Sequence, residues 1–361
     1  MKLFSFLLAF CFLTQAYGQE IDEHMPPVPG LPYVSLEDAG FNRDSIARLL
    51  QDIGDIPTRD FRGLVLVKDN QVVIEYYDNT FWRNTILDIR SAGKSITAIL
   101  LGVAMQEGLV DNLDQSVYSF FPKGKYPFIS EDYKKITLQH CLNMASGLDA
   151  DSDYSETPGN AFNWIAKDNW KDYILQVSAA SEPGEKWVYA DINAVLISLI
   201  IEETSGKSLK DFAQEKLFDP LGIQQVYWYT NASQQTGGAG NLYLTTLDFA
   251  KLGVVVANEG KWGDQQLMDE VYTKQLQQSQ NIELPEGYSF GDTYGELWYK
   301  AQRTFGNKKI NYLYASGNGG NYLIIVPDKE IVVAVTNSAY GQGYGHGRAR
   351  TIFRRLMTAM E

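Results

Sequence analysis

The chain has 361 residues, which is enough for one large domain or two medium ones, and its formal net charge is −13 at pH 7. A surface this acidic disfavours nucleic acids and anionic membranes as partners. The histidines are His24, His140 and His346, and none has the spacing of a paired metal site, so we expect neither a metal nor another cofactor.

The first residues have the pattern of a secretory signal peptide. A basic start at Lys2 is followed by an apolar run over 3–13 and by small residues over 16–18, which predicts cleavage near Gln19. The apolar run is too short to span a bilayer. We therefore expect an exported protein, periplasmic or extracellular, without membrane insertion. Cys141 is the one cysteine left after cleavage, so we expect no internal disulfide.

Strand patterns occur toward both ends of the chain and helical patterns between them. The expected elements, in chain order, are a helix within 36–53 that begins near Asn42 or Asp44, a hairpin over 62–77 that turns at Asp69-Asn70, a helix from Ser91 to Gly108, helices over 135–147, 190–205 and 247–258, strands over 311–315, 322–327 and 331–336, a glycine loop over 341–347 and a helix over 348–360.

This order predicts an α/β (α+β) fold. We expect an antiparallel sheet flanked by helices and formed by both ends of the chain, with an all-helical insertion domain. The expected division is a signal peptide over 1–18, an extended leader over 19–35, a sheet domain over 36–110 and 245–361, and a helical domain over 111–244.

Ser91 and Lys94 stand in the first turn of one expected helix. Side chains three residues apart share a helix face, so Lys94 can reach the Ser91 hydroxyl as a candidate base beside a nucleophile. A lysine acts as a base only when burial or a neighbouring cation lowers its pKa. A Ser-x-x-Lys match arises by chance roughly once in a chain this long. The alternative is therefore a serine that caps the helix and an exposed lysine.

Two later stretches add weight to the pair. Tyr189-Ala-Asp191 follows a Pro-Gly turn and opens a helix, although a tyrosine there can also be a plain core residue. The run 315–321, Ala-Ser-Gly-Asn-Gly-Gly-Asn, has glycines where a substrate could lie against backbone, or where a hairpin simply turns. An acidic, aromatic loop over 149–170 could line a substrate groove, or its tryptophans could cover the helices.

Taken in this order, the three stretches resemble the serine beta-lactamase and penicillin-binding-protein superfamily, in particular the branch of class C beta-lactamases, esterases and 6-aminohexanoate-dimer hydrolases. The resemblance runs from about Gly63 to Glu361. It includes four supporting stretches, at Ile136–Leu148, Ser181–Glu185, Phe218–Ile223 and Ala239–Thr246.

The resemblance implies a role for each matching residue. Ser91 would attack a carbonyl, Lys94 would take or relay its proton, and Tyr189 would complete the base and protonate the leaving group. The backbone N–H groups of Ser91 and Asn318 would form the oxyanion hole. Substrate contacts would come from Asp191, Asn193, Ser316, Gly317 and Gly319.

Two departures from the family pattern bear on the chemistry. The family's Tyr-x-Asn is Tyr189-Ala-Asp191 here, so the carboxylate of Asp191 could hold Lys94 charged, and Asn193 is a candidate for the missing amide. The family's Lys-Thr-Gly aligns with Ala315-Ser316-Gly317. The cation that would pair with a substrate carboxylate is therefore absent at this position.

We therefore expect an exported serine hydrolase that cleaves an ester or amide bond of a small substrate through an acyl-serine intermediate. One alternative is a beta-lactamase or D-Ala-D-Ala carboxypeptidase that receives the carboxylate with Arg348 or Arg350. Another is a non-catalytic ligand-binding module that keeps the fold. The identity of the substrate and the oligomeric state stay open.

Overall fold

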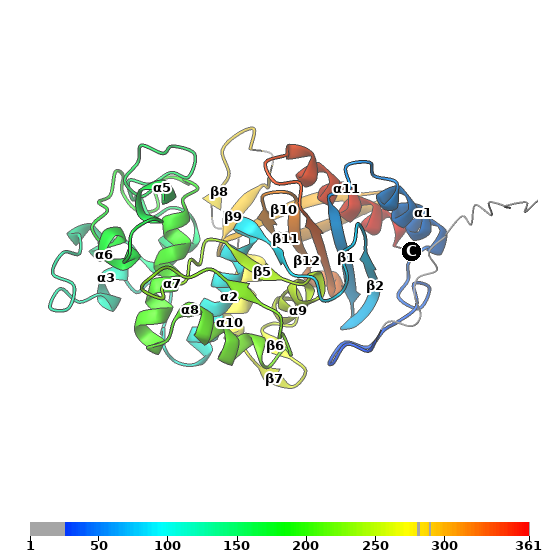
Figure 1. Cartoon of the computed structure of the whole chain (residues 1–361), viewed down its shortest axis with the longest axis horizontal. Helices are drawn as coiled ribbons and strands as arrows, with labels where there is room; N and C mark the ends of the chain where they lie inside the picture. Colours follow the sequence, from blue (N-terminus) through cyan, green and yellow to red (C-terminus); the bar gives the residue numbers. More distant parts are fainter. Residues whose placement is uncertain (1–25, 280–281, 289, 361) are drawn as a thin grey trace, which may run out of the picture.

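The computed structural model describes residues 26–279, 282–288 and 290–360 (Figure 1). The expected signal peptide, its cleavage point and the first part of the leader lie outside the described residues. None of the described helices is long and apolar enough to cross a bilayer.

An eight-stranded antiparallel sheet forms the centre of the fold, in the order β2-β1-β13-β12-β11-β10-β9-β8. Its strands from both ends of the chain meet where β1 pairs with β13, which confirms the expected α+β fold. The strands are β1 (Phe61–Lys68), β2 (Gln71–Tyr77), β8 (Ile282–Glu283), β9 (Thr293–Gly295), β10 (Trp298–Phe305), β11 (Lys308–Gly317), β12 (Asn321–Val326) and β13 (Ile331–Asn337).

The β1–β2 hairpin turns at the predicted residues. Asp69 and Asn70 have φ of 50° and 60°, the left-handed conformation that a two-residue hairpin turn of this kind requires at both central positions. Aspartate and asparagine tolerate this conformation better than most residues. The local sequence therefore sets the register of the pairs next to the turn, and an irregularity between Leu66 and Val67 shifts it further along the strands.

Helices cover both faces of the sheet. Thr336 of β13 bonds through its hydroxyl to Thr246 of α9 at 2.7 Å, whereas the next residue, Asn337, accepts a bond from Arg348 of α11 at 2.9 Å. Consecutive strand residues point to opposite faces, so α9 and α11 cover opposite faces of the sheet. Figure 1 shows α1 lying beside α11, away from α9. The three helices are α1 (Arg43–Gly54), α9 (Thr246–Ala257) and α11 (Gly343–Ala359).

Helix α2 is buried along most of its length, from Gly93 to Ala104, because it packs between α7 and the end of β11. The remaining elements are β3 (Leu87–Asp88), a 3₁₀ turn (Arg90–Ala92), α2 (Gly93–Gln106), α3 (Val117–Phe120), a 3₁₀ turn (Glu131–Lys134), α4 (Leu138–Leu142), α5 (Ala161–Trp164), α6 (Trp170–Ile174), α7 (Asp191–Ser205), α8 (Leu209–Ala213), a π-helical turn (Gln214–Phe218), β4 (Tyr227–Trp228), β5 (Leu242–Leu244), β6 (Lys261–Trp262), β7 (Gln265–Gln266), α10 (Glu270–Gln278) and a 3₁₀ turn (Pro327–Lys329).

The structure corrects two predicted elements. The helix expected over 135–147 ends at Leu142, because Met144 has a φ of 54° and its carbonyl accepts a bond from the N–H of Val188 instead of continuing a helix. The run over 341–347 is not a loose loop, since α11 already begins at Gly343. A Cβ on Gly345 would lie 2.3 Å from the carbonyl oxygen of Gly319, so glycine allows α11 to contact the β11–β12 turn.

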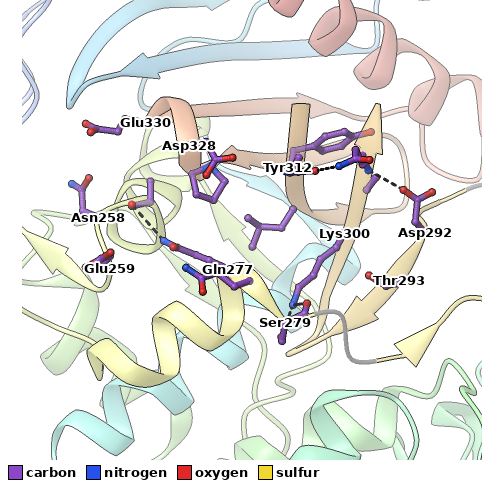
Figure 2. Close-up of a pocket in the computed structure, with 17 residues that line it drawn as sticks. Asn258, Glu259, Gln277, Ser279, Asp292, Thr293, Lys300, Tyr312, Asp328 and Glu330 are labelled. Atoms are coloured by element: carbon purple, nitrogen blue, oxygen red, sulfur yellow. Dashed lines mark hydrogen bonds between the residues drawn. The ribbon is translucent and has the colours of Figure 1, made fainter. Parts of the chain in front are cut away.

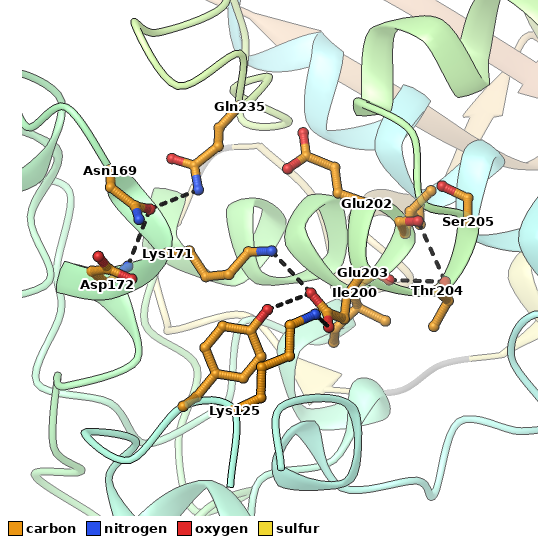
Figure 3. A network of polar contacts seen from close by, with 12 residues as sticks. Lys125, Asn169, Lys171, Asp172, Ile200, Glu202, Glu203, Thr204, Ser205 and Gln235 are labelled. Atoms are coloured by element: carbon orange, nitrogen blue, oxygen red, sulfur yellow. Dashed lines mark hydrogen bonds and ion pairs between the residues drawn. The ribbon is translucent and has the colours of Figure 1, made fainter. Parts of the chain in front are cut away.

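A polar network joins the elements of the helical region around Glu203 on α7 (Figure 3). Its carboxylate pairs with Lys125, accepts a bond from the Tyr126 hydroxyl at 2.5 Å and accepts one from Lys171 of α6 at 3.1 Å. Burial alone would raise the pKa of Glu203, but these three donors lower it below its ordinary value. The charged carboxylate therefore links three segments that lie far apart in the sequence.

We predict that Glu203→Gln lowers the free energy of unfolding by about 1–3 kcal/mol at pH 7, because bonds to a charged acceptor are lost while the shape is kept. A lowered carboxyl pKa stabilises the fold above the ordinary value of 4.5, and this contribution is lost as the pH falls through the folded pKa. In urea unfolding, the difference in free energy of unfolding between wild type and Glu203→Gln should therefore be smaller at pH 3 than at pH 7. Glu131→Gln, which removes an exposed partner of Lys123 and Lys134, is the control and should change little.

Candidate active site

Ser91 lies in the 3₁₀ turn that leads directly into α2. The preceding residue, Arg90, has a φ of 55°, which costs a non-glycine residue roughly 1–3 kcal/mol. Asp88 holds this strained turn: its carboxylate accepts a bond from the N–H of Arg90 at 2.8 Å, and its carbonyl accepts one from the Tyr340 hydroxyl at 3.0 Å. The strain is thus stored beside the serine that the sequence predicts as the nucleophile.

The end of β11 lies directly against the turn that carries Ser91. A Cβ on Gly317 would lie 1.9 Å from the carbonyl oxygen of Ile89, so only glycine permits this approach. The next residue, Asn318, is held by two bonds: its side-chain oxygen accepts from the N–H of Gly341 at 2.7 Å, and its carbonyl accepts from Asn321 at 3.0 Å. The two residues predicted to form the oxyanion hole line one cavity.

Lys94 is buried, with 2% of its side chain exposed, and it is surrounded by groups from two other segments. Its ammonium lies 2.7 Å from a carboxylate oxygen of Asp191, the first residue of α7, and donates to the carbonyl of Ala239 at 2.9 Å. The same nitrogen lies 4.9 Å from the centre of the Tyr189 ring. The structure therefore brings the three predicted polar residues of this region together.

Burial by itself would lower the pKa of Lys94, but the charge of Asp191, with a smaller contribution from Tyr189, raises it above its ordinary value. Lys94 is accordingly an ammonium at neutral pH.

Ser152, in the acidic loop, connects to both Tyr189 and Asp191. Its N–H donates to the carbonyl of Tyr189 at 2.9 Å, and its hydroxyl accepts a bond from the N–H of Asp191 at 3.1 Å. These bonds fix the entry to α7. Neither was foreseen from the sequence, because a serine in an irregular loop carries no positional pattern.

A cavity of about 610 Å³ contains Ser91 and several predicted site residues. Of these, Tyr189, Ser316 and Asn318 line it directly. Among the lining residues that sequence reasoning did not assign are carboxylates, aromatic rings and one histidine. They are Asp151, Asp153, Trp187, Tyr288, Phe290, Tyr299 and His346. The two aspartates fall within the loop that was considered as a substrate groove, whereas the rings and the histidine come from later segments.

Three other predicted site residues lie behind the cavity wall. Asn193 is 1% exposed and its side-chain nitrogen lies 3.5 Å from the sulfur of Met144. It points away from Lys94 because two steps along a helix turn a side chain through about 200°. Gly317 contacts the Ser91 turn, and Gly319, with a φ of 89°, packs against Tyr340.

The two tryptophans of the acidic loop, and Tyr173 just after it, pack against the protein and do not line the cavity. Trp164 and Trp170 are buried and meet edge to face, with ring centres 5.4 Å apart. The Tyr173 hydroxyl donates to the carbonyl of Pro158. The packing interpretation of these residues is therefore the correct one.

The two arginines considered as receivers of a substrate carboxylate do not line the cavity. Arg348 is held by Asp60 at 2.6 Å, by Asn337 at 2.9 Å and by Thr58 at 2.9 Å. The guanidinium of Arg350 lies 6.0 Å from the centre of the Phe290 ring. Among the described residues, no cluster of histidine, cysteine and acidic side chains is arranged to hold a metal ion.

A larger cavity, of about 850 Å³, lies between the end of α10 and strands β10 and β11 (Figure 2). It also contains a lysine beside a serine: Lys300 donates to the Ser279 hydroxyl at 2.8 Å and to Glu296 at 2.9 Å. The Ser279 hydroxyl in turn donates to Glu296 at 2.8 Å. This serine is therefore part of a buried ion-pair network that joins α10 to β10, and the cavity contains none of the predicted site residues.

Comparisons with known proteins agree on one family. Residues 46–356 match the family described as Beta-lactamase. Penicillin-binding protein 4* of Bacillus subtilis is 24% identical over 212 residues, covering 52% of this chain and 42% of that protein. Teichoic acid D-alanine hydrolase of Staphylococcus aureus is 26% identical over 199 residues, covering 47% and 45%. The chain thus matches less than half the length of either relative.

The fold comparison extends over more of the chain. The structure of a penicillin-binding protein homologue from Caulobacter crescentus superposes with a TM-score of 0.67 at 16% identity, covering 88% of this chain and 96% of that one. A similarity at this level of identity establishes a shared fold.

We predict that Asp191→Asn lowers the free energy of unfolding by about 3 kcal/mol at pH 7, because a buried ammonium loses its counter-charge. In the wild type the raised pKa of Lys94 gives full stabilisation below the ordinary value of 10.5, which is lost only as the pH rises through the folded pKa. In the variant, burial lowers the pKa of Lys94. The difference in free energy of unfolding between wild type and variant should therefore become smaller between pH 7 and pH 10. Urea unfolding at both pH values measures this.

The control is the double variant Lys94→Met/Asp191→Asn. Since it contains no unpaired buried charge, it should recover much of the stability lost in Asp191→Asn. A double variant as unstable as the single one would show that the loss has another origin.

Proposed function

The chain belongs to the beta-lactamase family, and from this premise we propose that it is an exported serine hydrolase that opens an ester or amide bond of a small substrate through an acyl-serine at Ser91. The arrangement that supports the proposal is a serine on a strained turn, in one cavity with Tyr189, in front of a buried lysine. Folding alone does not need these three groups together, so the arrangement favours an enzyme over a non-catalytic binding module.

In the proposed first step, the Ser91 oxygen attacks the substrate carbonyl. Tyr189 relays the serine proton to the leaving group as the bond to that group breaks. Water then attacks the acyl-serine, and its proton returns to the Ser91 oxygen by the same path. The ammonium of Lys94 lies 4.9 Å from the centre of the Tyr189 ring. It stabilises negative charge that develops near Tyr189 during the proton transfer.

Lys94 is the residue whose proposed role differs from that of a simple base. Burial lowers the pKa of Lys94, but the charge of Asp191 raises it above its ordinary value, and an ammonium cannot accept the serine proton. We therefore assign Lys94 an electrostatic role and give the proton transfer to Tyr189.

The backbone N–H groups of Ser91 and Asn318 are the proposed oxyanion hole. Two bonds hold Asn318 in place, and the contact between Gly317 and Ile89 sets its distance from the serine turn. Such preorganised donors stabilise the negative charge on the carbonyl oxygen that forms in the transition state.

Beta-lactamase or D-alanyl carboxypeptidase activity is the alternative that the curated relatives suggest. It is disfavoured here because Ala315 replaces the family's lysine and because Arg348 is engaged by Asp60, Asn337 and Thr58.

We predict that brief exposure to a p-nitrophenyl ester adds one acyl mass to the intact protein, and that Ser91→Ala abolishes both this adduct and the release of p-nitrophenol. Intact-protein mass spectrometry and absorbance measure the two quantities in one sample. Release of p-nitrophenol without an adduct in the wild type indicates fast deacylation. Turnover retained by Ser91→Ala would refute the proposal, and an adduct from a penicillin instead of the ester would favour the beta-lactamase alternative.

We also predict that Gly317→Ala lowers kcat/KM for the ester by roughly 100-fold, because the new methyl group must push β11 away from the serine turn. A misplacement of about 1 Å at the reacting atoms has an effect of this order. Gly124→Ala is the control, since a Cβ there meets nothing within 4 Å. An unchanged kcat/KM in a correctly folded Gly317→Ala would contradict the proposed oxyanion hole.

A further inference from the structure

We propose that the Ser91 cavity selects neutral or cationic substrates over substrates that carry a carboxylate, and that a positive charge on His346 weakens this selection in acid. The inference rests on the proposed function, because it names the class of substrate for the same cavity. It concerns the charge on the part of the substrate that lies away from the cleaved bond.

The formal charges that line the cavity are negative. Among the described lining residues there is no lysine or arginine, whereas Asp151 and Asp153 both contribute carboxylates. Lys94 is not a lining residue and is paired with Asp191 at 2.7 Å, so its charge acts on the reacting atoms beside Tyr189 and not on a carboxylate elsewhere in the substrate. A substrate carboxylate would therefore meet like charges without a compensating cation, which disfavours binding.

The aromatic wall of the cavity favours the opposite charge. Trp187 and Tyr288 meet with ring centres 5.0 Å apart, Tyr288 and Phe290 with centres 5.4 Å apart, and Phe290 and His346 with centres 5.1 Å apart. Ring faces attract ammonium groups and do not attract carboxylates. Burial raises the pKa of Tyr288, and the charge of Asp153 contributes to this rise, so this carboxylate is electrostatically close to the aromatic wall.

His346 stands at the end of this wall, on the first turns of α11. Its Nδ1 lies 3.5 Å from the Ser316 hydroxyl of β11 and 3.2 Å from the Tyr322 hydroxyl of β12. Phe290 covers the ring from a separate segment. Nδ1 therefore faces the sheet. The imidazole ring lines the cavity, and its other nitrogen, Nε2, is not the one that faces the sheet.

Histidine is the one side chain type in this lining whose charge ordinarily changes between pH 5 and pH 8. Burial, together with the charge of Arg350 one turn further along α11, lowers the pKa of His346 below its ordinary value of 6.5. The other titratable groups around it are Tyr322, beside the ring, and the carboxylates and tyrosines of the cavity wall. His346 is accordingly neutral at pH 7.5 and gains a positive charge only in acid.

The test uses three p-nitrophenyl esters of similar size whose acyl chains end in a methyl, a trimethylammonium or a carboxylate group. At pH 7.5 and low salt, we expect kcat/KM for the carboxylate ester to be at least about tenfold below that of the methyl ester. We expect the trimethylammonium ester to react at least as well as the methyl ester. Equal kcat/KM for the carboxylate and methyl esters would overturn the proposed selection.

His346 is tested through the ratio of kcat/KM for the carboxylate ester to that for the methyl ester. In the wild type this ratio should rise as the pH falls from 7.5 to 5, because His346 becomes positive. In His346→Gln, which stays neutral, the ratio should be nearly independent of pH, and in His346→Lys it should be raised already at pH 7.5. Both values in each ratio come from the same protein sample, so a fraction of misfolded protein lowers both equally and does not change the ratio.

The matched control is His140→Gln. His140 lies in a capping box of α4 and bonds to the backbone of Thr137, a contact that glutamine can also make, so this variant should keep the wild-type dependence of the ratio on pH. If His346→Gln also kept the dependence of the ratio on pH, that dependence would come from Asp151 and Asp153. The role of His346 would then be refuted. Failure of Ser91 to act on any of the three esters would instead refute the proposed function.

Discussion

The arrangement of the site depends on one buried ion pair, between Lys94 of α2 and Asp191 of α7. The buried ammonium of Lys94 is costly without a counter-charge, and the partly exposed carboxylate of Asp191 supplies it where the two helices meet. The carbonyl of Ala239 completes the coordination of the ammonium and brings a third segment to the same place. Ser91 and Tyr189 are the near neighbours of these two charges in the sequence, and the ion pair consequently positions both.

Close contacts between backbones complete the arrangement. Gly317 allows β11 to touch the turn before Ser91, and a Cβ on Gly93 would lie 3.2 Å from the Cα of Gly240. Side chains at these positions would separate the strand, the turn and the loop. The strained φ of Arg90 is tolerated because neighbouring elements hold the turn on several sides. The close packing at the site thus depends on glycines, which have no side chain, as well as on the side chains of other residues.

The sequence predicted the features that depend on local chemistry. Asn42 caps α1, Asp69-Asn70 turns the first hairpin and Gly206 ends α7, each through an interaction within a few residues. The family resemblance placed Ser91, Lys94, Tyr189 and Asn318 in order along the chain, and the structure places them around one site.

Features that depend on distant contacts escaped prediction. Strand β10 was missed because polar residues such as Lys300 and Gln302 interrupt its apolar pattern. Lys300 is buried because Glu296 balances its charge and Ser279 accepts its hydrogen bonds. His346 gave no signal, since a lone histidine in a glycine-rich run does not indicate that it will face Ser316. Asp191 was recognised as a possible partner of Lys94, but only the packing of two helices determines that Lys94 is buried and that the two charges meet.

The pairing of β1 with β13 has a consequence for how the chain reaches this state. The partners Phe61 and Asn337 are separated by most of the sequence, so the contact order of the sheet is high and its closure is slow. While the chain is being synthesised, β1 and β2 form an isolated hairpin that is at best marginally stable. The central strands can align only after β13 has left the ribosome. A chain with this topology therefore leaves the apolar strands at both edges of this gap unpaired until synthesis is nearly complete.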